Sequence, residues 1–377
     1  MAKVSVLNCS SYDKETVYKT INNSLNLINF RIPDGITVLV KPNVLNPYKP
    51  EKAITTHPAI VDAVCRILKQ KDCNIIIGDS SGIFIGGSTQ RAFKLSGIEA
   101  VAKKYNAQLV AFEGSKIITI VDKRAKVLKK ITISSIPKNV DLIINLPKLK
   151  THMLTKYTGA VKNMFGCIPG ALKQKYHITG GNEKRFSHLL LDIYQNIKPG
   201  LNILDGIIGM EGNGPSAGKP KKAGIIIASE DAIALDIIAA KIIGYNPKDI
   251  YTNSLAVERG IFDGEIDIVG DANIKINFKK PETNKLKLIP PLLNEIVFNI
   301  LFRVYPFVDK EKCRKCGVCV KACAAGAITM KPYPEVSRLK CITCFCCHEM
   351  CPYAAINLKR PRIMELLSSV LRKITGK

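Results

Sequence analysis

The sequence is poor in acidic and aromatic residues, and it contains no tryptophan. Its 377 residues include 31 Asp and Glu against 56 Lys and Arg, which gives a formal net charge of +25, and only 6% are aromatic. A protein with an excess of positive charge can bind nucleic acid, an acidic protein or an anionic small molecule. The lysines are scattered and are not interleaved with aromatic residues, and no nucleic-acid-binding motif is present, so we do not expect nucleic-acid binding.

The sequence also lacks an export segment and an apolar run long enough to cross a bilayer. It begins Met-Ala-Lys-Val-Ser-Val-Leu-Asn, which predicts a strand, and polar residues interrupt the apolar stretch 286–308. We therefore expect a cytoplasmic protein without integral membrane insertion. A connecting segment with an amphipathic helix is predicted at 281–309 and a basic helix at 361–377. Both are expected to pack on the protein, and contact with a membrane surface remains an open alternative.

Nucleotide-binding motifs are missing too. Residues 213–220 have asparagine where a P-loop needs its first glycine and proline where it needs Ser or Thr. Residues 82–87 do not complete the dinucleotide fingerprint. We therefore predict neither a Walker-type ATPase nor a standard NAD site.

What the sequence does have is thirteen cysteines, eight of them in two runs of the same spacing, C-x₂-C-x₂-C-x₃-C. Such runs hold cubane [4Fe–4S] clusters, each taking three thiolates from one run and the fourth from the other. We expect two clusters in a small α+β ferredoxin-like domain at 310–360. The predicted ligands are Cys313, Cys316, Cys319 and Cys351 for the first cluster, and Cys341, Cys344, Cys347 and Cys323 for the second.

A structural zinc site is the alternative for this stretch, but zinc has no use for a fourth cysteine taken from the other run. The stretch resembles a two-cluster ferredoxin domain. It departs from that family at Ala324, where proline is usual, while Pro352 is present after the second run. Cys346 is an additional thiol, interpreted as a passive neighbour of Cys347. Free thiols in this number are typical of a reducing compartment.

Residues 1–280 alternate strand-like and helix-like patterns, which predicts an α/β domain with a largely parallel sheet and flanking helices. A hairpin is predicted from 117–121 and 127–133. The other expected strands are 3–8, 36–40, 74–78, 108–112, 141–146, 201–204 and 223–228, and the expected helices are 13–28, 57–69, 189–197 and 231–243.

Four of these strands are followed by polar or charged residues, and ligands of open α/β sheets bind beyond the carboxyl ends of the strands. We therefore expect one site there, against the alternative of ordinary surface loops. Lysine suits an anionic group, and histidine or a carboxylate can move protons. The predicted catalytic residues are Lys148, His152 and Glu211. The predicted substrate-binding residues are Lys41, Asn43, Asp79, Ser80, Lys150, Lys162, Asn163 and Asp205.

Five short motifs together resemble the family known as domain of unknown function 362: Lys41-Pro42-Asn43, Gly78-Asp79-Ser80, the run from Asn145 to His152, Gly159-Ala160-Val161-Lys162-Asn163 and Asp205-Gly206. The resemblance covers nearly the whole chain, since members often carry a ferredoxin-like module. It implies iron–sulfur electron carriage and fixes no substrate.

Two functions stay open. In the first, the protein is an oxidoreductase that passes electrons to an anionic substrate, or to an additional unidentified cofactor in the α/β domain; tethering raises the local concentration of the electron donor. In the second, it is a non-catalytic carrier whose α/β domain docks a partner or binds a ligand. Both functions include a redox partner protein, expected to be acidic because of the basic charge.

Overall fold

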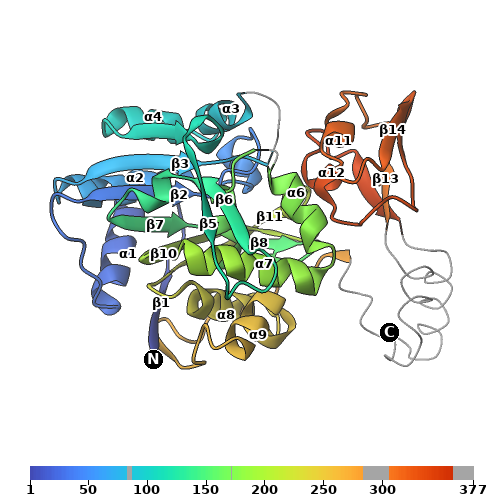
Figure 1. Cartoon of the computed structure of the whole chain (residues 1–377). Helices are drawn as coiled ribbons and strands as arrows, with labels where there is room; N and C mark the ends of the chain where they lie inside the picture. Colours follow the sequence, from blue (N-terminus) through green and yellow to red (C-terminus); the bar gives the residue numbers. More distant parts are fainter. Residues whose placement is uncertain (83–86, 171, 283–304, 360–377) are drawn as a thin grey trace.

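The computed structural model describes residues 1–82, 87–170, 172–282 and 305–359. Residues 1–282 build an α/β sandwich, and residues 305–359 build a small module beside it (Figure 1). The helices predicted within 281–309 and 361–377 fall mostly or wholly outside the described residues. Within the described residues, no helix is long and apolar enough to cross a membrane.

The central sheet is largely parallel, as predicted. Along its main path β11 runs against both neighbours, while the remaining pairings are parallel. The strand order is β12 (Ile266–Gly270), β1 (Ala2–Asn8), β11 (Lys219–Ser229), β10 (Leu201–Glu211), β7 (Leu142–Leu146), β2 (Thr37–Pro42), β3 (Asn74–Asp79) and β4 (Gln108–Ala111). The carboxyl ends of β2, β3, β7 and β10 therefore meet at one edge.

Helices cover both faces of the sheet, because alternate side chains of its strands point to opposite sides. On β2, Val38 and Val40 join the core under one helical layer, while Leu39 joins the other. One layer contains α1 (Lys14–Leu27), α2 (Pro58–Lys69), α3 (Ser88–Leu95) and α4 (Ile98–Lys104). The other contains α5 (Ala160–Asn163), α7 (Glu183–Asn196), α8 (Ala232–Ile242) and α9 (Tyr251–Glu258).

Local capping explains several of these helix starts. The Asp13 side chain accepts from Thr16 N at the start of α1, and Asp231 accepts from Ile233 N and Ala234 N at the start of α8. His57 precedes α2, whose first turn holds Pro58. The predicted hairpin is present as β5 (Ile117–Val121) and β6 (Lys130–Ser134).

Two predicted loops at the sheet edge are strands. Residues 148–152 form β8 (Lys148–His152), which pairs with β9 (Lys156–Thr158), and β10 continues to Glu211 instead of ending at Leu204. The continuation is possible because β10 exchanges β7 for β8 as its neighbour and shifts register with β11 between Gly206 and Ile208. The prediction that β10 ends at 204 was wrong.

The module repeats one backbone pattern around its two cysteine runs. The left-handed residues Lys315 and Gly317 in the first run correspond to Thr343 and Phe345 in the second. Each run leads into a short helix and then a strand. The elements are β13 (Tyr305–Val308), α11 (Val318–Lys321), β14 (Ile328–Lys331), β15 (Tyr333–Val336), α12 (Cys346–Glu349) and β16 (Ile356–Lys359). The module lies beside α6 (Leu172–Gly180), where Gln174 donates to the Lys321 carbonyl at 2.8 Å (Figure 1).

Candidate functional site at the edge of the sheet

A buried ion pair joins the ends of β2 and β3. Lys41 Nζ lies 2.7 Å from Asp79 Oδ1, and both side chains are almost fully buried. Asp79 also accepts from Val44 N at 2.7 Å and from Ser80 N at 2.8 Å. Burying a charged group is costly unless the group is paired and hydrogen-bonded, and these donors hold Asp79 in place, so the pair forms a fixed floor at the edge of the sheet.

A chain of amides extends this floor. Lys150 Nζ donates to Asn43 Oδ1 at 2.6 Å, and Asn43 Nδ2 donates to Asn163 Oδ1 at 2.9 Å. Asn163 in turn donates to Asn145 Oδ1 at 2.7 Å. Burial lowers the pKa of Lys150 well below its usual value, and the charges of Lys162 and Lys148 lower it further. The hydrogen bond from Lys150 Nζ fixes which way the Asn43 amide faces.

The segment 159–166 begins and ends with a glycine, and it packs against Asp236 and the Lys41–Asp79 pair. Asp236 accepts from Ala160 N at 2.7 Å and Val161 N at 3.0 Å, which holds the start of α5. A side chain at Gly159 would collide with Asp236, and one at Gly166 would collide with both members of the Lys41–Asp79 pair. The two glycines let the segment bring Lys162 and Asn163 to the edge of the sheet.

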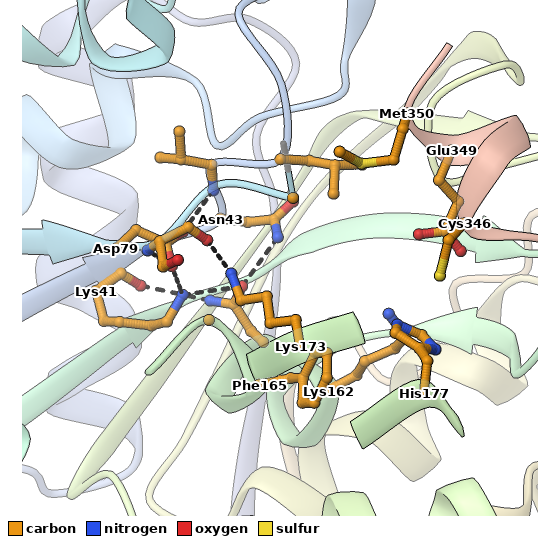
Figure 2. A pocket seen from close by; sticks show the side chains of 16 residues that line it. Lys41, Asn43, Asp79, Lys162, Phe165, Lys173, His177, Cys346, Glu349 and Met350 are labelled. Atoms are coloured by element: carbon orange, nitrogen blue, oxygen red, sulfur yellow. Dashed lines mark hydrogen bonds and ion pairs between the residues drawn. The ribbon is translucent and has the colours of Figure 1, made fainter. Parts of the chain in front are cut away.

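The α/β domain and the module share a cavity of about 80 Å³, which the Lys41–Asp79 pair, Asn43 and Asn163 help to line. Figure 2 shows Lys162, Lys173 and His177 below the cavity, with Glu349, Cys346 and Met350 of the module on the opposite side. The further lining residues are Lys41, Asn43, Val44, Leu45, Asp79, Ser80, Gly82, Asn163, Phe165 and Gly166. The second cysteine run thus supplies one wall of the cavity.

Glu349 fixes that wall to the α/β domain. Its carbonyl accepts from Asn46 Nδ2 at 2.9 Å and from Ser216 Oγ at 2.7 Å. Its carboxylate Oε1 lies 3.1 Å from His152 Nε2, although neither atom completes a hydrogen bond of regular geometry. Burial alone would raise the pKa of Glu349, but His152, Lys162 and His177 outweigh it and lower the pKa to about 2.

The imidazoles near this wall are neutral at physiological pH. Burial lowers the pKa of His152 and of His177 to about 4. His152 Nδ1 accepts from Leu154 N and Thr155 N, so its proton sits on Nε2 and faces Glu349. His177 Nδ1 is buried and has no hydrogen-bond partner among the described residues.

Two lysines supply positive charge to the cavity. Lys173 Nζ donates to the carbonyls of Ser80 and Ser81, and burial lowers its pKa to about 8. Burial also lowers the pKa of Lys162, for which no ion pair or hydrogen bond is recorded within the described residues. Lys162 is therefore the cation best placed to receive an anion.

A second buried pair lies outside the cavity. Lys148 Nζ lies 2.7 Å from Asp205 Oδ2 and donates to Tyr12 Oη at 2.8 Å. Tyr12 Oη donates to the other oxygen of Asp205 at 2.7 Å, and His57 N donates to Oδ2 at 2.9 Å. Every polar group of this cluster has a partner, which indicates a structural role.

The predicted site residues thus divide into two groups. Lys41, Asn43, Asp79, Ser80, Lys162 and Asn163 line the cavity, while Lys148, Lys150, His152, Asp205 and Glu211 do not. His152 reaches the cavity indirectly, through Glu349. Glu211 accepts from Lys279 N at 2.9 Å, away from the cavity, so the structure gives it no place in proton transfer there.

The predicted cysteine ligands are brought together as two neighbouring sets. Burial raises the pKa of the Cys319 thiol, and the nearby thiols of Cys351, Cys316 and Cys313 raise it further, which matches the first set. The four cysteines of the second set, Cys323, Cys341, Cys344 and Cys347, line one small hollow. Backbone N–H groups of Ala327, Thr343 and Ala355 point at Cys323, Cys341 and Cys351.

Such N–H···S contacts are typical of iron–sulfur ligands, so both sets fit the clusters. In the part of the chain that the structure describes, no three His, Cys, Asp or Glu side chains are placed to hold a single metal ion.

Comparison with known proteins supports both halves of this architecture. The model of the family described as domain of unknown function (DUF362) matches residues 38–241. The chain belongs to the DUF362 family. A 4Fe-4S binding domain matches residues 305–328, so the module of this DUF362 protein is an iron–sulfur domain. That match includes the first cysteine run and ends before the second.

A thylakoid-associated protein from Synechocystis is 32% identical over 263 residues, which are 68% of this chain and 79% of the relative. Among solved structures, the lactate racemase apoprotein from Thermoanaerobacterium thermosaccharolyticum shares 12% identity with a TM-score of 0.41. That alignment covers 66% of this chain and 57% of the racemase, and we draw nothing from it about activity.

Sequence reasoning missed three residues of the DUF362 cavity. Glu349 was passed over because it lies among cysteines, and Lys173 and His177 because they follow a segment with no strand end. The available signal was modest: an acidic residue between Cys347 and Cys351 in an otherwise basic chain. Contacts between the module and the α/β domain have no local sequence pattern that would reveal them.

Proposed function

We propose that this DUF362 protein is an iron–sulfur oxidoreductase in which the cavity holds the electron acceptor. The observation that carries the proposal is the wall formed by Cys346, Glu349 and Met350, which places the second cysteine run directly against the cavity. Two [4Fe–4S] clusters, held by the two cysteine sets, would supply one-electron transfer.

Cys346 lies between the second cysteine set and the cavity. It lines the hollow of the second cysteine set and also lines the cavity, with its side chain buried. One residue thus separates the two spaces, so that only a few atoms lie between them. This short separation is what an electron-transfer site requires and what an unrelated binding pocket would have no reason to provide.

The cavity favours a small anion. Lys162 and Lys173 provide positive charge, and His177 Nδ1 is a free polar atom beside them. One water needs about 10–15 Å³ of such space, so 80 Å³ admits a ligand about as large as five to eight waters. A small carboxylate or another oxyanion meets both conditions.

Protons would come from the histidines that face this wall. Glu349, with its pKa held near 2, stays ionised at neutral pH and faces the proton that His152 carries on Nε2. His177 can exchange a proton through Nδ1. These groups therefore give the ligand a proton route from the α/β domain and an electron route from the module.

The test begins with anaerobically purified protein. Native mass spectrometry should show the chain plus two clusters, and bicarbonate, acetate, phosphate and sulfite are then titrated while the electron paramagnetic resonance of the reduced clusters is recorded. At least one anion should shift the spectrum of the wild type and leave that of Lys162→Met unchanged. Lys19→Met, on the exposed face of α1, is the matched control.

The alternative is a non-catalytic electron carrier, which the iron–sulfur match by itself also supports. If no anion shifts the spectrum and Lys162→Met transfers electrons as fast as the wild type, the carrier is the correct function. A single-cluster mass would instead remove the second cysteine set from the proposal.

We place the protein in the cytoplasm, because iron–sulfur ligands together with further free cysteines are typical of a reducing compartment. Fractionation of the native host tests this location. Recovery of the protein with the membranes at high salt would contradict it.

A further inference from the structure

The two cysteine runs differ in what covers them. In the first run, Arg314, Lys315 and Cys316 are exposed to solvent. In the second run, residues 345–351 are all buried, and the Glu349 carbonyl accepts hydrogen bonds from Asn46 and Ser216 of the α/β domain. The module therefore has an open side at the first run and a closed side at the second, which faces the cavity.

The open side carries a cluster of cations, Lys310, Arg314 and Lys315, which we call the basic face. Lys315 Nζ lies 4.5 Å from the centre of the Tyr333 ring, and Lys310 Nζ lies 5.7 Å from it. Cation–π contacts of this kind restrict long side chains that would otherwise move freely. The tyrosine thus holds two lysines together beside the first run.

The basic face has little internal neutralisation. No ion pair is recorded for its three cations within the described residues, and Lys312 nearby is paired with Asp309 at 3.1 Å. Two further acidic residues, Glu311 beside Lys310 and Glu335 near Tyr333 in the sequence, are exposed. The three cations of the basic face are therefore exposed to a partner, while a cluster held by the first run would bring a formal charge of about −2 beneath them.

We propose that the basic face docks an acidic protein that carries single electrons, and that docking brings this protein against Cys316. One electron leaves the reduced partner and is taken up by the module at its open side; no proton or other group moves. Entry at the first run and exit at the second would give the module a direction. The proposal requires that the module hold its clusters, and it does not depend on what the cavity holds.

Charge alone does not select this face, because cations are spread over the whole chain. The exposed cysteine selects it. Electrons reach a buried centre most readily where the protein covering is thinnest, and Cys316 is the one ligand cysteine in the exposed class among the described residues. Electrostatic complementarity at such a point raises the association rate by about 10- to 1,000-fold at low salt.

The experiment measures binding of the full holoprotein to a strongly acidic flavodoxin by biolayer interferometry, at low and at high ionic strength. The variant Lys310→Glu/Lys315→Glu reverses the basic face and leaves all cysteines in place. The matched control, Lys14→Glu/Lys19→Glu, makes the same change of charge on α1, which lies far from the module in Figure 1. Iron content verifies that both variants keep their clusters.

We expect the wild type to bind with an affinity that weakens as salt rises, and the reversed variant to lose at least tenfold at low salt. The control should change less than about twofold. A milder variant, Lys310→Gln/Lys315→Gln, keeps the test usable if the reversed variant loses iron; it should give an intermediate loss.

Equal losses in the reversed variant and the control would overturn the proposal, because net charge and not this face would then govern binding. Binding to vesicles of anionic phosphatidylglycerol without binding to flavodoxin would also overturn it, in favour of a membrane contact. Failure of the cavity variant Lys162→Met to change anything would leave this result untouched, so the two proposals fail separately.

Discussion

Two lysine–aspartate pairs at the same edge of the sheet show how similar groups acquire different roles. The pairs Lys41–Asp79 and Lys148–Asp205 have the same 2.7 Å separation and are both buried. The first borders the cavity, with Lys173 close to Asp79. The second is closed off by Tyr12 and the His57 backbone. Accessibility to a ligand, and not the pairing itself, distinguishes a site from a structural support.

Removing the lysine of each pair is the strongest test of this difference. Lys148→Met leaves the Asp205 carboxylate in a sealed space, and breaking a buried pair in this way costs about 3–5 kcal/mol. Lys41→Met should cost less, about 1–3 kcal/mol, because Lys173 and water in the cavity still stabilise Asp79. Urea unfolding followed by circular dichroism measures both. Equal losses in the free energy of unfolding would show that the cavity does not stabilise the unpaired Asp79 carboxylate.

A methyl group at Gly166 should disturb the Lys41–Asp79 pair, which borders the cavity. Its Cβ would collide with Asp79 Oδ1 and Lys41 Nζ, so Gly166→Ala should destabilise the protein by about 1–3 kcal/mol. The control is Gly114→Ala, since nothing lies within 4 Å of a Cβ at Gly114. A shift in the thermal midpoint for Gly166→Ala alone supports the close approach, and equal midpoints would refute it.

The affinity of the cavity for an anion should depend on pH near neutrality. Lys173 has its pKa lowered to about 8 by burial, so it is charged below that pH and loses its charge above it. Affinity for the anion found by titration should therefore fall roughly tenfold between pH 7 and pH 9, as expected for the loss of one charged contact. Isothermal titration calorimetry should show this fall in the wild type and a shallower one in Lys173→Met.

The smallest expected effect concerns Cys346. If it separates the cavity from the second cysteine set without being a ligand, Cys346→Ser should keep the full iron content and alter only the spectral shift caused by the anion. A stability loss of about 1 kcal/mol is expected, because a serine hydroxyl replaces a buried thiol. Loss of half the iron would show instead that Cys346 is a ligand.

Much of the fold could be predicted from the sequence, because apolar periodicity and helix caps are local. The start of α8 at Asp231 and the hairpin of β5 and β6 were predicted on such patterns and are present. The extension of β10 was not predicted, because its polar residues 205–206 look like a strand end. Its change of partner from β7 to β8 depends on contacts that the sequence does not display.

The candidate site could be predicted only in part. Lys41, Asn43 and Asp79 were predicted from their place at the ends of β2 and β3, and they line the cavity. The sequence could not separate Lys41 from Lys148, since Tyr12, which seals the second pair, lies far away in the chain. Likewise, nothing near Glu349 indicates that it faces His152 across two parts of the protein.

The shared wall also dictates an order of assembly. Cys346, Glu349 and Met350 belong to a module whose cysteines have no fixed partners until iron and sulfide arrive, and metal binding is coupled to folding in small domains of this kind. The α/β domain can form its own core first, but it cannot enclose a ligand alone. If the cavity binds a ligand as we propose, cluster insertion should precede ligand capture, and protein that is short of iron should stay open at its cavity.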